Sequence, residues 1–303
     1  MREVYKKRVE TLVQALPYIR SFSGKTVVIK YGGAAMSSAD LRREFATDIA
    51  LLRYVGIKPI IVHGGGNEVS DYMKRLDLPV RFVEGLRVTD AATMEVVKMV
   101  LVGKVNKEIV GLLNQQGARA VGLGGDDGLL IEARRLSRPA ADGSLLDLGL
   151  VGEVTRVNVE LLRLLEGDYV PVVATVGVGD DGESYNINAD TVASEIAAAM
   201  KAEKLITLTD VEGVMKTGPD GTPVVIASMT ESEANELIRS GVIMGGMIPK
   251  ILGCLDTVNR GVGRAHIIDG RIPHSLLLEI FTNRGIGTMI MKERRPYYQG
   301  EKI

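Results

Sequence analysis

Short apolar runs alternate with longer amphipathic segments along most of the chain. The runs are rich in β-branched residues and continuous rather than alternating, which is typical of strands buried on both faces. They cover residues 26–30, 58–62, 169–176, 204–210 and 265–269. Between them, apolar positions recur at helical spacing over 39–55, 67–77, 90–116, 159–166, 190–202, 230–240 and 247–260. This alternation predicts an α/β fold in which helices cover both faces of a mostly parallel sheet.

The first 20 residues precede the first strand of this pattern and form one more amphipathic segment. Their apolar side chains fall on one helical face; they are Tyr5, Val9, Leu12, Val13, Leu16 and Ile19. The residues alone leave two interpretations open. The helix packs on its own domain, or it crosses to a neighbouring subunit, because the fold could already start at Thr26.

Composition narrows the class of protein. The 303 residues suffice for one large α/β domain or two lobes that share a sheet, and 46% hydrophobic with 25% charged residues is ordinary for a globular protein. A net charge of −1 gives no indication of nucleic acid or an anionic membrane as a partner. Cys254 is the one cysteine, and the chain has neither a membrane-length apolar run nor a signal-peptide stretch. We therefore expect a cytoplasmic metabolic enzyme.

Two lysines near the first strand could contact a phosphate. Gly24-Lys25-Thr26 resembles the end of a P-loop, but the first glycine of that motif would fall on Ile19 and the triplet enters a strand instead of leaving one. Lys25 is therefore interpreted as a solvated charge. Lys30 ends the strand ahead of a Gly-Gly pair whose backbone N–H groups can approach an anion. Taken alone, this position is equally compatible with a structural role in which Lys30 binds no phosphate.

Two further turns carry candidate binding groups. HGGGN at 63–67 is a second glycine turn between a strand and a helix, where N–H groups are free for an anion. His63 at a buried strand end is more often a hydrogen-bonded structural residue than a catalytic one. GLRVTD at 85–90 places Arg87 in a loop, and its planar fork suits a carboxylate. The alternative for Arg87 is a surface salt bridge.

Two predicted helices begin with charged residues of interest. In NINAD at 186–190, Asn188 is a candidate N-cap, and the helix dipole keeps Asp190 ionised. Asp190 could be a helix-start charge alone. GGMIPK at 245–250 places Lys250 in a first helical turn, where the dipole disfavours a cation. An anion bound between that helix end and the lysine would remove the conflict.

The remaining glycine-rich stretches do not match a dinucleotide fingerprint. GLGGDDG at 122–128 and GVGDDG at 177–182 lack the G-x-G-x-x-G spacing with a following helix. We predict that both are β-hairpin turns.

Taken in order, IKYGG, VHGGGN, GLRVTD, NINAD, TLTDVEGV and GGMIPK resemble the amino acid kinase family over essentially the whole chain. HGGGNEVSDYMKRL followed by PVRFVEGLRVTD is the most discriminating stretch, and it favours the N-acetyl-L-glutamate kinases within that family. The resemblance implies a three-layer αβα sandwich with a central, mostly parallel open sheet. It also implies an N-terminal lobe (23–180) for N-acetyl-L-glutamate and dimerisation, and a C-terminal lobe (181–303) for ATP and arginine.

The implied reaction is ATP-dependent phosphorylation of the side-chain carboxylate of N-acetyl-L-glutamate, in arginine biosynthesis. Lys30 and Lys250 would flank the transferring phosphoryl group, and Asp190 would orient both. The other implied contacts are Gly65, Gly66, Arg87 and Asn186 for the substrate, Gly32, Gly33 and Gly65 for backbone N–H bonds, and Asp210, Gly213 and Lys250 for ATP. Mg²⁺ would bind mainly through the nucleotide phosphates, and no metal site of the protein itself is predicted.

This inventory agrees with the chemistry. A carboxylate nucleophile is already ionised at neutral pH, so the reaction needs positioning and charge stabilisation rather than a general base. Two alternatives stay open: a kinase for glutamate or aspartate, and a non-catalytic arginine sensor on the same scaffold. A sensor would be expected to lack Lys30, Asp190 or Lys250, and all three are present.

Regulation is also implied by the resemblance. Residues 1–22 look like the N-terminal helix that interlaces dimers into a ring-shaped homohexamer, a trimer of dimers, in the arginine-inhibited members. The stretch 265–289 matches their C-terminal pattern, which predicts feedback inhibition by arginine. The implied effector ligands are Tyr18, Lys216, His266, Glu279 and Gly285, with a surface carboxylate as the alternative for Glu279. A PII-type nitrogen-signalling protein is a further candidate partner.

Overall fold

The computed structural model describes residues 2–138, 146–218, 220–282 and 285–296, and in this part of the chain the main sheet has eight strands. Their order is β14 (Ser228–Thr230), β16 (Thr288–Met291), β15 (Arg264–Asp269), β11 (Lys204–Thr209), β1 (Thr26–Tyr31), β2 (Lys58–His63), β8 (Val170–Ala174) and β5 (Ala120–Leu123). The strands from β15 to β5 run parallel, and β16 pairs antiparallel with β15. The predicted mostly parallel open sheet is confirmed.

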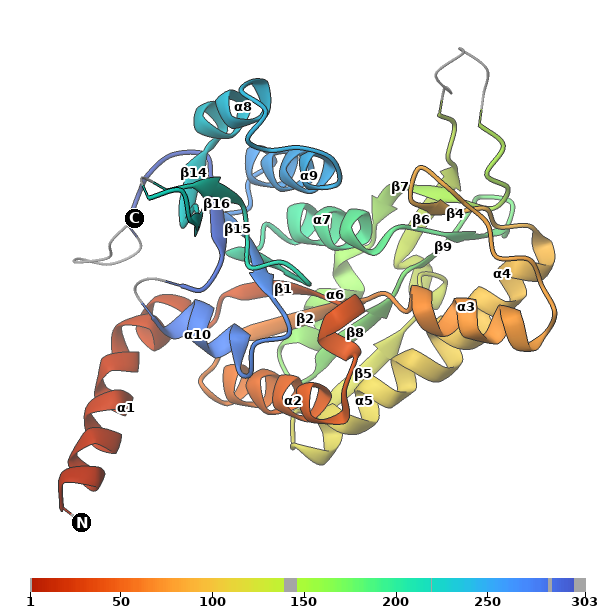
Figure 1. Ribbon diagram of the computed structural model, residues 1–303. Helices are drawn as coiled ribbons and strands as arrows, with labels where there is room; N and C mark the ends of the chain where they lie inside the picture. The colour runs from red at the N-terminus through yellow and green to blue at the C-terminus, as the bar shows by residue number, and fades with distance from the viewer. Residues whose placement is uncertain (1, 139–145, 219, 283–284, 297–303) are drawn as a thin grey trace.

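Helices cover both faces of this sheet (Figure 1). One layer contains α2 (Ala39–Tyr54), α5 (Asn106–Gln115) and α10 (Ser275–Phe281). The other contains α6 (Val159–Glu166), α7 (Ala189–Met200), α8 (Glu231–Arg239) and α9 (Met247–Asn259). Each face has its own apolar core, so the three-layer αβα sandwich is confirmed.

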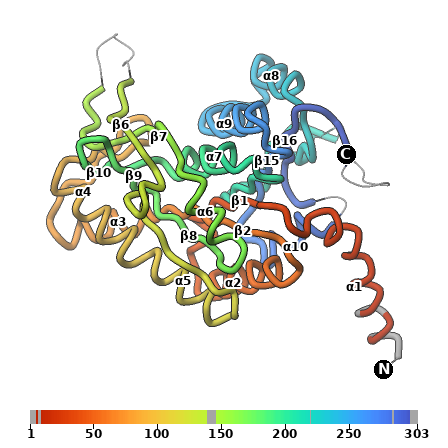
Figure 2. The backbone as a smooth tube through the Cα atoms, turned by 180° about the vertical axis from the view of Figure 1, so that it is seen from behind, coloured from red at the N-terminus to blue at the C-terminus, as the bar shows by residue number. Residues whose placement is uncertain are grey.

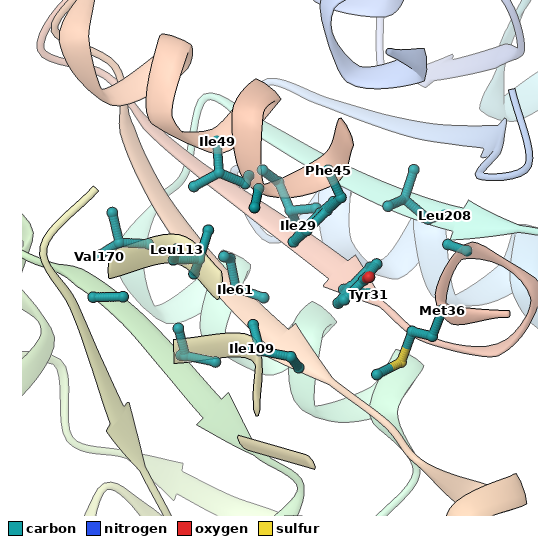
Figure 3. Packing of buried hydrophobic residues seen from close by; sticks show 14 of the residues in the cluster. Ile29, Tyr31, Met36, Phe45, Ile49, Ile61, Ile109, Leu113, Val170 and Leu208 are labelled. Carbon is teal, nitrogen blue, oxygen red and sulfur yellow. The ribbon is translucent and has the colours of Figure 1, made fainter. Parts of the chain in front are cut away.

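Strand β1 supplies side chains to both cores by alternation. Ile29 and Tyr31 enter the core beneath α2, where the Tyr31 ring stacks on Phe45 with centroids 3.7 Å apart (Figure 3). Val28 enters the opposite core, beneath α7. Lys30 therefore points to the α7 face of the sheet, which is the face that carries the candidate site.

The remaining elements complete the described chain. A second sheet contains β10 (Ser184–Asn186), β9 (Val176–Val178), β6 (Ile131–Arg135) and β7 (Gly152–Val157). Two small ribbons are formed by β3 (Phe82–Val83) with β4 (Leu86–Arg87) and by β12 (Met215–Thr217) with β13 (Pro223–Val225). The other helical segments are α1 (Arg2–Phe22), η1 (Gly33–Met36), α3 (Gly66–Arg75), α4 (Ala91–Lys98), η2 (Met99–Val105) and η3 (Asp127–Leu129).

Three expectations need correction. The run 169–176 is not one strand, because the chain turns at Thr175 from β8 in the main sheet into β9 in the second sheet. The amphipathic stretch 90–116 is helical, but its middle is the π-helical segment η2. The stretch 122–128 is not a hairpin turn, because it links β5 of the main sheet to β6 of the second sheet. The hairpin predicted at 177–182 is confirmed by the β9–β10 pair.

The N-terminal helix α1 extends away from the rest of the molecule in both views (Figures 1 and 2). Its last turns are anchored: Tyr18 and Phe22 are buried, and Tyr18 meets Phe281 of α10 edge to face. Its apolar face is exposed, with Leu12 at 73% and Val13 at 61% of their full surface. The interpretation that α1 packs along its own domain is therefore wrong for most of the helix.

No helix within the described ranges is both long enough and apolar enough to span a membrane.

An ion pair between a buried carboxylate and a half-exposed imidazole connects α2 to the start of α10. The Asp48 carboxylate is 2% exposed and lies 2.6 Å from Nδ1 of His274, the residue that precedes α10. Burial raises the pKa of Asp48 to about 6, although the hydrogen bond from His274 lowers it. The same hydrogen bond raises the pKa of His274 above its ordinary value.

This pair makes the stability of the fold depend on pH. A histidine with a raised pKa stabilises the folded state below its unfolded pKa, and this contribution is lost as the pH rises through the folded-state value. Burial lowers the pKa of His63 and of His266 to about 4. Of the three histidines in the chain, His274 is therefore the one that titrates above about pH 6.5.

We expect the free energy of unfolding to decrease between about pH 6 and pH 8.5 more steeply in the wild type than in Asp48→Asn. Asparagine still accepts the hydrogen bond of the imidazole, but it removes the charge that raises the pKa of His274. Urea denaturation at several pH values measures the difference. Parallel curves for the two proteins would contradict the prediction.

Candidate active site

The candidate site lies where the strand order of the main sheet reverses. The chain passes from β1 to β2 on one side and later returns to β11 on the other side of β1. In open α/β sheets, such a reversal leaves a crevice at the carboxyl ends of the strands, where ligands bind. Lys30, His63 and Thr209 lie at or next to the carboxyl ends of these three strands.

One carboxylate joins two lysines from distant parts of the chain. Asp190 Oδ1 lies 3.2 Å from Lys30 Nζ, and Asp190 Oδ2 accepts a hydrogen bond of 3.0 Å from Lys250 Nζ. Asn188 caps α7, as predicted, and its Oδ1 accepts from the backbone N–H of Asp190 at 2.8 Å. Lys250 occupies the first turn of α9. The structure thus brings together the three residues predicted to be catalytic.

Asp190 is a permanent anion in this array. Burial opposes its ionisation, but the charges of Lys30 and Lys250 outweigh burial and hold its pKa below the ordinary value. Both carboxylate oxygens are occupied by ammonium groups, so Asp190 is not arranged to accept a proton from a substrate. The group as a whole carries one net positive charge and is suited to hold a phosphoryl group.

Two glycine turns adjoin this array. The backbone N–H of Gly64 donates to the Tyr31 carbonyl at 3.0 Å, and an added Cβ on Gly32 would lie 3.5 Å from the Gly64 nitrogen. Gly33 is exposed, whereas Gly65 is buried, has φ +156°, and would place a Cβ 2.7 Å from Leu101 Cδ2. Glycine is therefore required at position 65. Gly65 also precedes α3, whose first N–H groups have no partner within the helix.

A pocket of about 200 Å³ begins at the second glycine turn. Its lining includes Gly65, Gly66, Arg87, Leu101, Asn186 and Ala189. The Asn186 side chain donates to Thr89 Oγ1 at 3.2 Å. The structure thus gathers all four residues predicted for the substrate around one pocket.

Arg87 is buried in this pocket, so the alternative of a surface salt bridge is wrong. Its Nη2 donates to the Gly66 carbonyl and to Ser70 Oγ, each at 2.7 Å, and its guanidinium lies 4.7 Å from the centroid of the Phe82 ring. Burial lowers its pKa, but a guanidinium stays protonated in proteins. Among the ion pairs of the described residues, none joins Arg87 to a carboxylate. A buried cation of this kind indicates an anionic ligand.

The residues predicted for ATP follow β11. Asp210 is exposed directly after this strand. Gly213 has φ +138°, and a Cβ there would lie 2.7 Å from Thr288 Oγ1, a hydroxyl that also accepts from the Val214 N–H. Packing alone explains glycine at 213, so its role toward a nucleotide stays a prediction.

A second polar cluster lies beneath the end of α1. His266 Nδ1 lies 2.6 Å from Glu279 Oε1, and Glu279 Oε2 accepts from the Ile286 N–H at 2.7 Å. An added Cβ on Gly285 would lie 2.6 Å from Glu279 Oε2. Glu279 is 7% exposed, so the alternative of a surface carboxylate is wrong.

Lys204 is a member of this cluster that sequence reasoning missed. Its Nζ lies 3.3 Å from His266 Nε2 and 4.7 Å from the centroid of the Phe22 ring of α1. The predicted Lys216 is exposed on the β12–β13 ribbon, outside the contacts that define this cluster, and its role toward arginine stays a prediction. The signal for Lys204 was its position at the start of a strand-length, mostly apolar run, where a buried lysine must find a partner.

The other sequence interpretations concern His63, Lys25 and metals. His63 is fully buried and hydrogen-bonded, as expected of a structural residue, and Lys25 is half exposed and pairs with Glu203 at 3.3 Å. In the described residues, no group of three or more His, Cys, Asp or Glu side chains is arranged to hold a metal ion.

Comparison with known proteins identifies the family of this chain. The sequence profile that matches residues 25–269 describes the amino acid kinase family. The chain belongs to the amino acid kinase family. Among its relatives, the acetylglutamate kinase of Symbiobacterium thermophilum is 57% identical over 287 residues, which cover 94% of this chain and 98% of that protein.

Two solved structures of one enzyme are also similar. N-acetylglutamate synthase from Neisseria gonorrhoeae complexed with coenzyme A and N-acetyl-glutamate matches with a TM-score of 0.81 at 26% identity, over 95% of this chain and 64% of that chain. The same synthase complexed with coenzyme A and L-arginine matches with a TM-score of 0.76 at 25% identity, over 94% and 65% of the two chains. This chain therefore spans slightly less than two thirds of the synthase.

Proposed function

We propose that this protein transfers the γ-phosphoryl group of MgATP to the side-chain carboxylate of N-acetyl-L-glutamate. The products are N-acetyl-L-glutamyl 5-phosphate and ADP, and the step belongs to arginine biosynthesis. The observation that carries the proposal is the Lys30–Asp190–Lys250 array beside a pocket with a buried arginine that lacks a carboxylate partner. The 57% identical acetylglutamate kinase supports the choice of substrate.

The array performs the central task of this reaction, which is to bring two anions together. Lys30 extends from β1 and Lys250 from α9, and Asp190 holds both ammonium groups at one place. The positive charges of the two lysines stabilise a phosphoryl group placed between them as its negative charge redistributes in the transition state. The Gly65 N–H, at the adjoining turn, is a further donor to that group. No general base is needed because the attacking carboxylate is already ionised.

Arg87 supplies the recognition of the substrate. Its guanidinium is held by Gly66 and Ser70 and lies against the Phe82 ring, so little side-chain freedom remains to be lost on binding. A carboxylate of N-acetyl-L-glutamate is the natural partner for its remaining N–H donors. Asn186, held by Thr89, contributes an amide to the lining of the same pocket. We place ATP on the side of the site where Asp210 lies. The protein itself is expected to work in the cytoplasm.

The assay that tests the proposed function is ADP release with N-acetyl-L-glutamate, L-glutamate and L-aspartate as separate substrates. Turnover confined to the acetylated substrate is the expected result. Preference for a free amino acid would favour the alternative of another acidic amino acid kinase. Arginine binding without turnover of any substrate would favour a sensor.

Replacing Lys30 or Lys250 with alanine is expected to lower kcat by about 10²–10³, as loss of one preorganised transition-state donor does. KM for both substrates should change much less. Steady-state kinetics measures the effect, and Lys25→Ala serves as the matched control because Lys25 pairs only at the surface with Glu203. Near-normal turnover of either variant would remove that lysine from the site.

Replacing Arg87 with methionine is expected to raise KM for N-acetyl-L-glutamate by about 10²-fold and to leave KM for ATP nearly unchanged, since loss of a buried charged hydrogen-bond partner costs about 2–5 kcal/mol. Arg75→Met is the control, because Arg75 is an exposed arginine at the end of the same helix that positions Arg87. An unchanged KM for N-acetyl-L-glutamate would exclude Arg87 from the substrate site.

We also propose feedback inhibition by arginine through the cluster of Tyr18, Lys204, His266, Glu279 and Gly285, in a homohexamer joined by α1. Two observations support it. The apolar face of α1 is exposed, so it can be covered by the same helix of another subunit. The similar synthase is known in complex with L-arginine. Glu279, buried and ionised, is suited to pair with the cationic group of arginine.

Leu12→Glu in the exposed face of α1 is expected to dissociate hexamers and weaken arginine inhibition while kcat without arginine is retained. The added charge would be buried against an apolar partner surface. Light scattering and inhibition curves measure both effects, and deletion of residues 2–20 should reproduce them. Gln14→Glu adds the same charge to another face of the helix and should remain hexameric. A hexameric Leu12→Glu variant would contradict the model.

A further inference from the structure

His63 is a buried histidine that the proposed reaction does not yet use. It ends β2, is 0% exposed, and contacts one group at each ring nitrogen. Its Nε2 lies 3.0 Å from Nδ2 of Asn106, the first residue of α5. Its Nδ1 lies 2.8 Å from the carbonyl oxygen of Gly64. Which nitrogen carries the proton decides what this residue can do.

The contacts of Asn106 decide the position of that proton. Asn106 Nδ2 donates to the Val172 carbonyl at 2.9 Å, and Asn106 Oδ1 accepts from the Lys107 ammonium at 3.2 Å. A carbonyl can only accept and an ammonium can only donate, so the orientation of the amide is fixed. The atom that faces His63 is therefore the Nδ2 donor, and Nε2 of the imidazole must accept. The proton lies on Nδ1, from which it is donated to the Gly64 carbonyl.

This hydrogen bond fixes the peptide between Gly64 and Gly65. In a trans peptide the C=O and the following N–H point in opposite directions. The Gly64 carbonyl is turned toward His63, so the Gly65 N–H is turned away from it. The Gly64 N–H is held as well, by the Tyr31 carbonyl at 3.0 Å. No hydrogen bond among the described residues uses the Gly65 N–H, and Gly65 lines the substrate pocket.

Without His63, a glycine turn could present the opposite face of this peptide. Glycine has wide backbone freedom, and Gly64 and Gly65 are consecutive, so rotation of the peptide between them meets little steric resistance on its own. A rotated peptide would direct the Gly64 carbonyl, an electron-rich oxygen, to the place where the N–H is needed. Charge stabilisation depends on donors that are already oriented before the reaction.

We propose that His63 is a positioning residue that holds the Gly64–Gly65 peptide with its N–H directed to the transferring phosphoryl group, and that Asn106 enforces the tautomer this requires. This role rests on the proposed phosphoryl transfer and adds His63 to the residues that support that reaction. Burial also lowers the pKa of His63 to about 4, and the nearby Lys107 acts in the same direction, so the neutral ring persists at neutral pH.

Two substitutions separate this role from filling of the core. His63→Asn can place an amide N–H where Nδ1 lies and so keeps the donor to Gly64. His63→Gln can place a polar group only near the Nε2 position and loses that donor. We expect His63→Asn to retain kcat within about threefold and His63→Gln to lower it by about 10–100-fold, less than outright loss of an oxyanion donor. KM for both substrates should change little, because the peptide matters mainly in the transition state.

The controls keep the two levels of inference apart. Turnover of N-acetyl-L-glutamate by the wild type decides the proposed function, whereas the contrast between the two His63 variants decides the positioning role. Thermal unfolding of both variants shows whether they fold equally well. Equal turnover by two folded variants, or a loss that appears only in KM, would overturn the proposal.

A spectroscopic measurement needs no turnover and no stable variant. Solid-state ¹⁵N spectra of histidine-labelled protein report which ring nitrogen is protonated, and His63 can be assigned through its contacts to Asn106. A neutral ring protonated at Nδ1 near pH 7 is the expected result. A ring protonated at Nε2, or at both nitrogens, would overturn the proposal, because the donor to Gly64 or the acceptor for Asn106 would be absent.

Discussion

The shared carboxylate of Asp190 is the interaction on which the site depends. Two ammonium groups from β1 and α9 could not lie together in a partly buried crevice without an anion between them. Asp190 provides that anion from the first turn of α7, which lies against β1 and beside α9. The same ion pairs therefore connect the strand and the two helices before any substrate is present. In the proposed reaction, the charges that would receive the phosphoryl group are thus already in place, so little rearrangement is required.

Arg87 shows the opposite arrangement, a buried charge with no anion beside it in the described structure. Leaving such a cation without a carboxylate costs stability in the free protein, and a bound carboxylate removes that cost. The pocket at Arg87 is therefore expected to be more stable with an anionic ligand bound than without one. The π-helical segment η2 contributes to the same region, because Leu101 packs against Gly65 and lines the pocket. Substrate binding and the integrity of this part of the fold are consequently coupled.

Local patterns of apolar runs, glycine turns and helix starts predicted the sheet and most helices, and they marked Lys30, Asp190 and Lys250 as separate candidates. That these three residues meet was implied by the resemblance to the amino acid kinase family. The sequence did not predict the break at Thr175 or the segment η2, because apolar continuity looks the same on both sides of such a break. It also missed Lys204 for a related reason, whereas the role of Lys216 toward arginine stays a prediction. Which lysine meets His266 depends on the pairing of β11 with β15, which no local pattern encodes. The Asn106–His63 contact joins residues 43 positions apart and was equally hidden.

Successive side chains of β1 face opposite sides of the sheet, so the position of each residue along the strand decides which side it enters. Ile29 and Tyr31 belong to the core under α2, while Lys30 belongs to the site under α7, and only one residue separates the two environments. Insertion or deletion of a single residue within the strand would move every following side chain to the opposite face of the sheet. An aromatic ring would then face Asp190, and a lysine would enter the core. The six residues of β1 therefore tolerate substitution within each environment but not a change in their number.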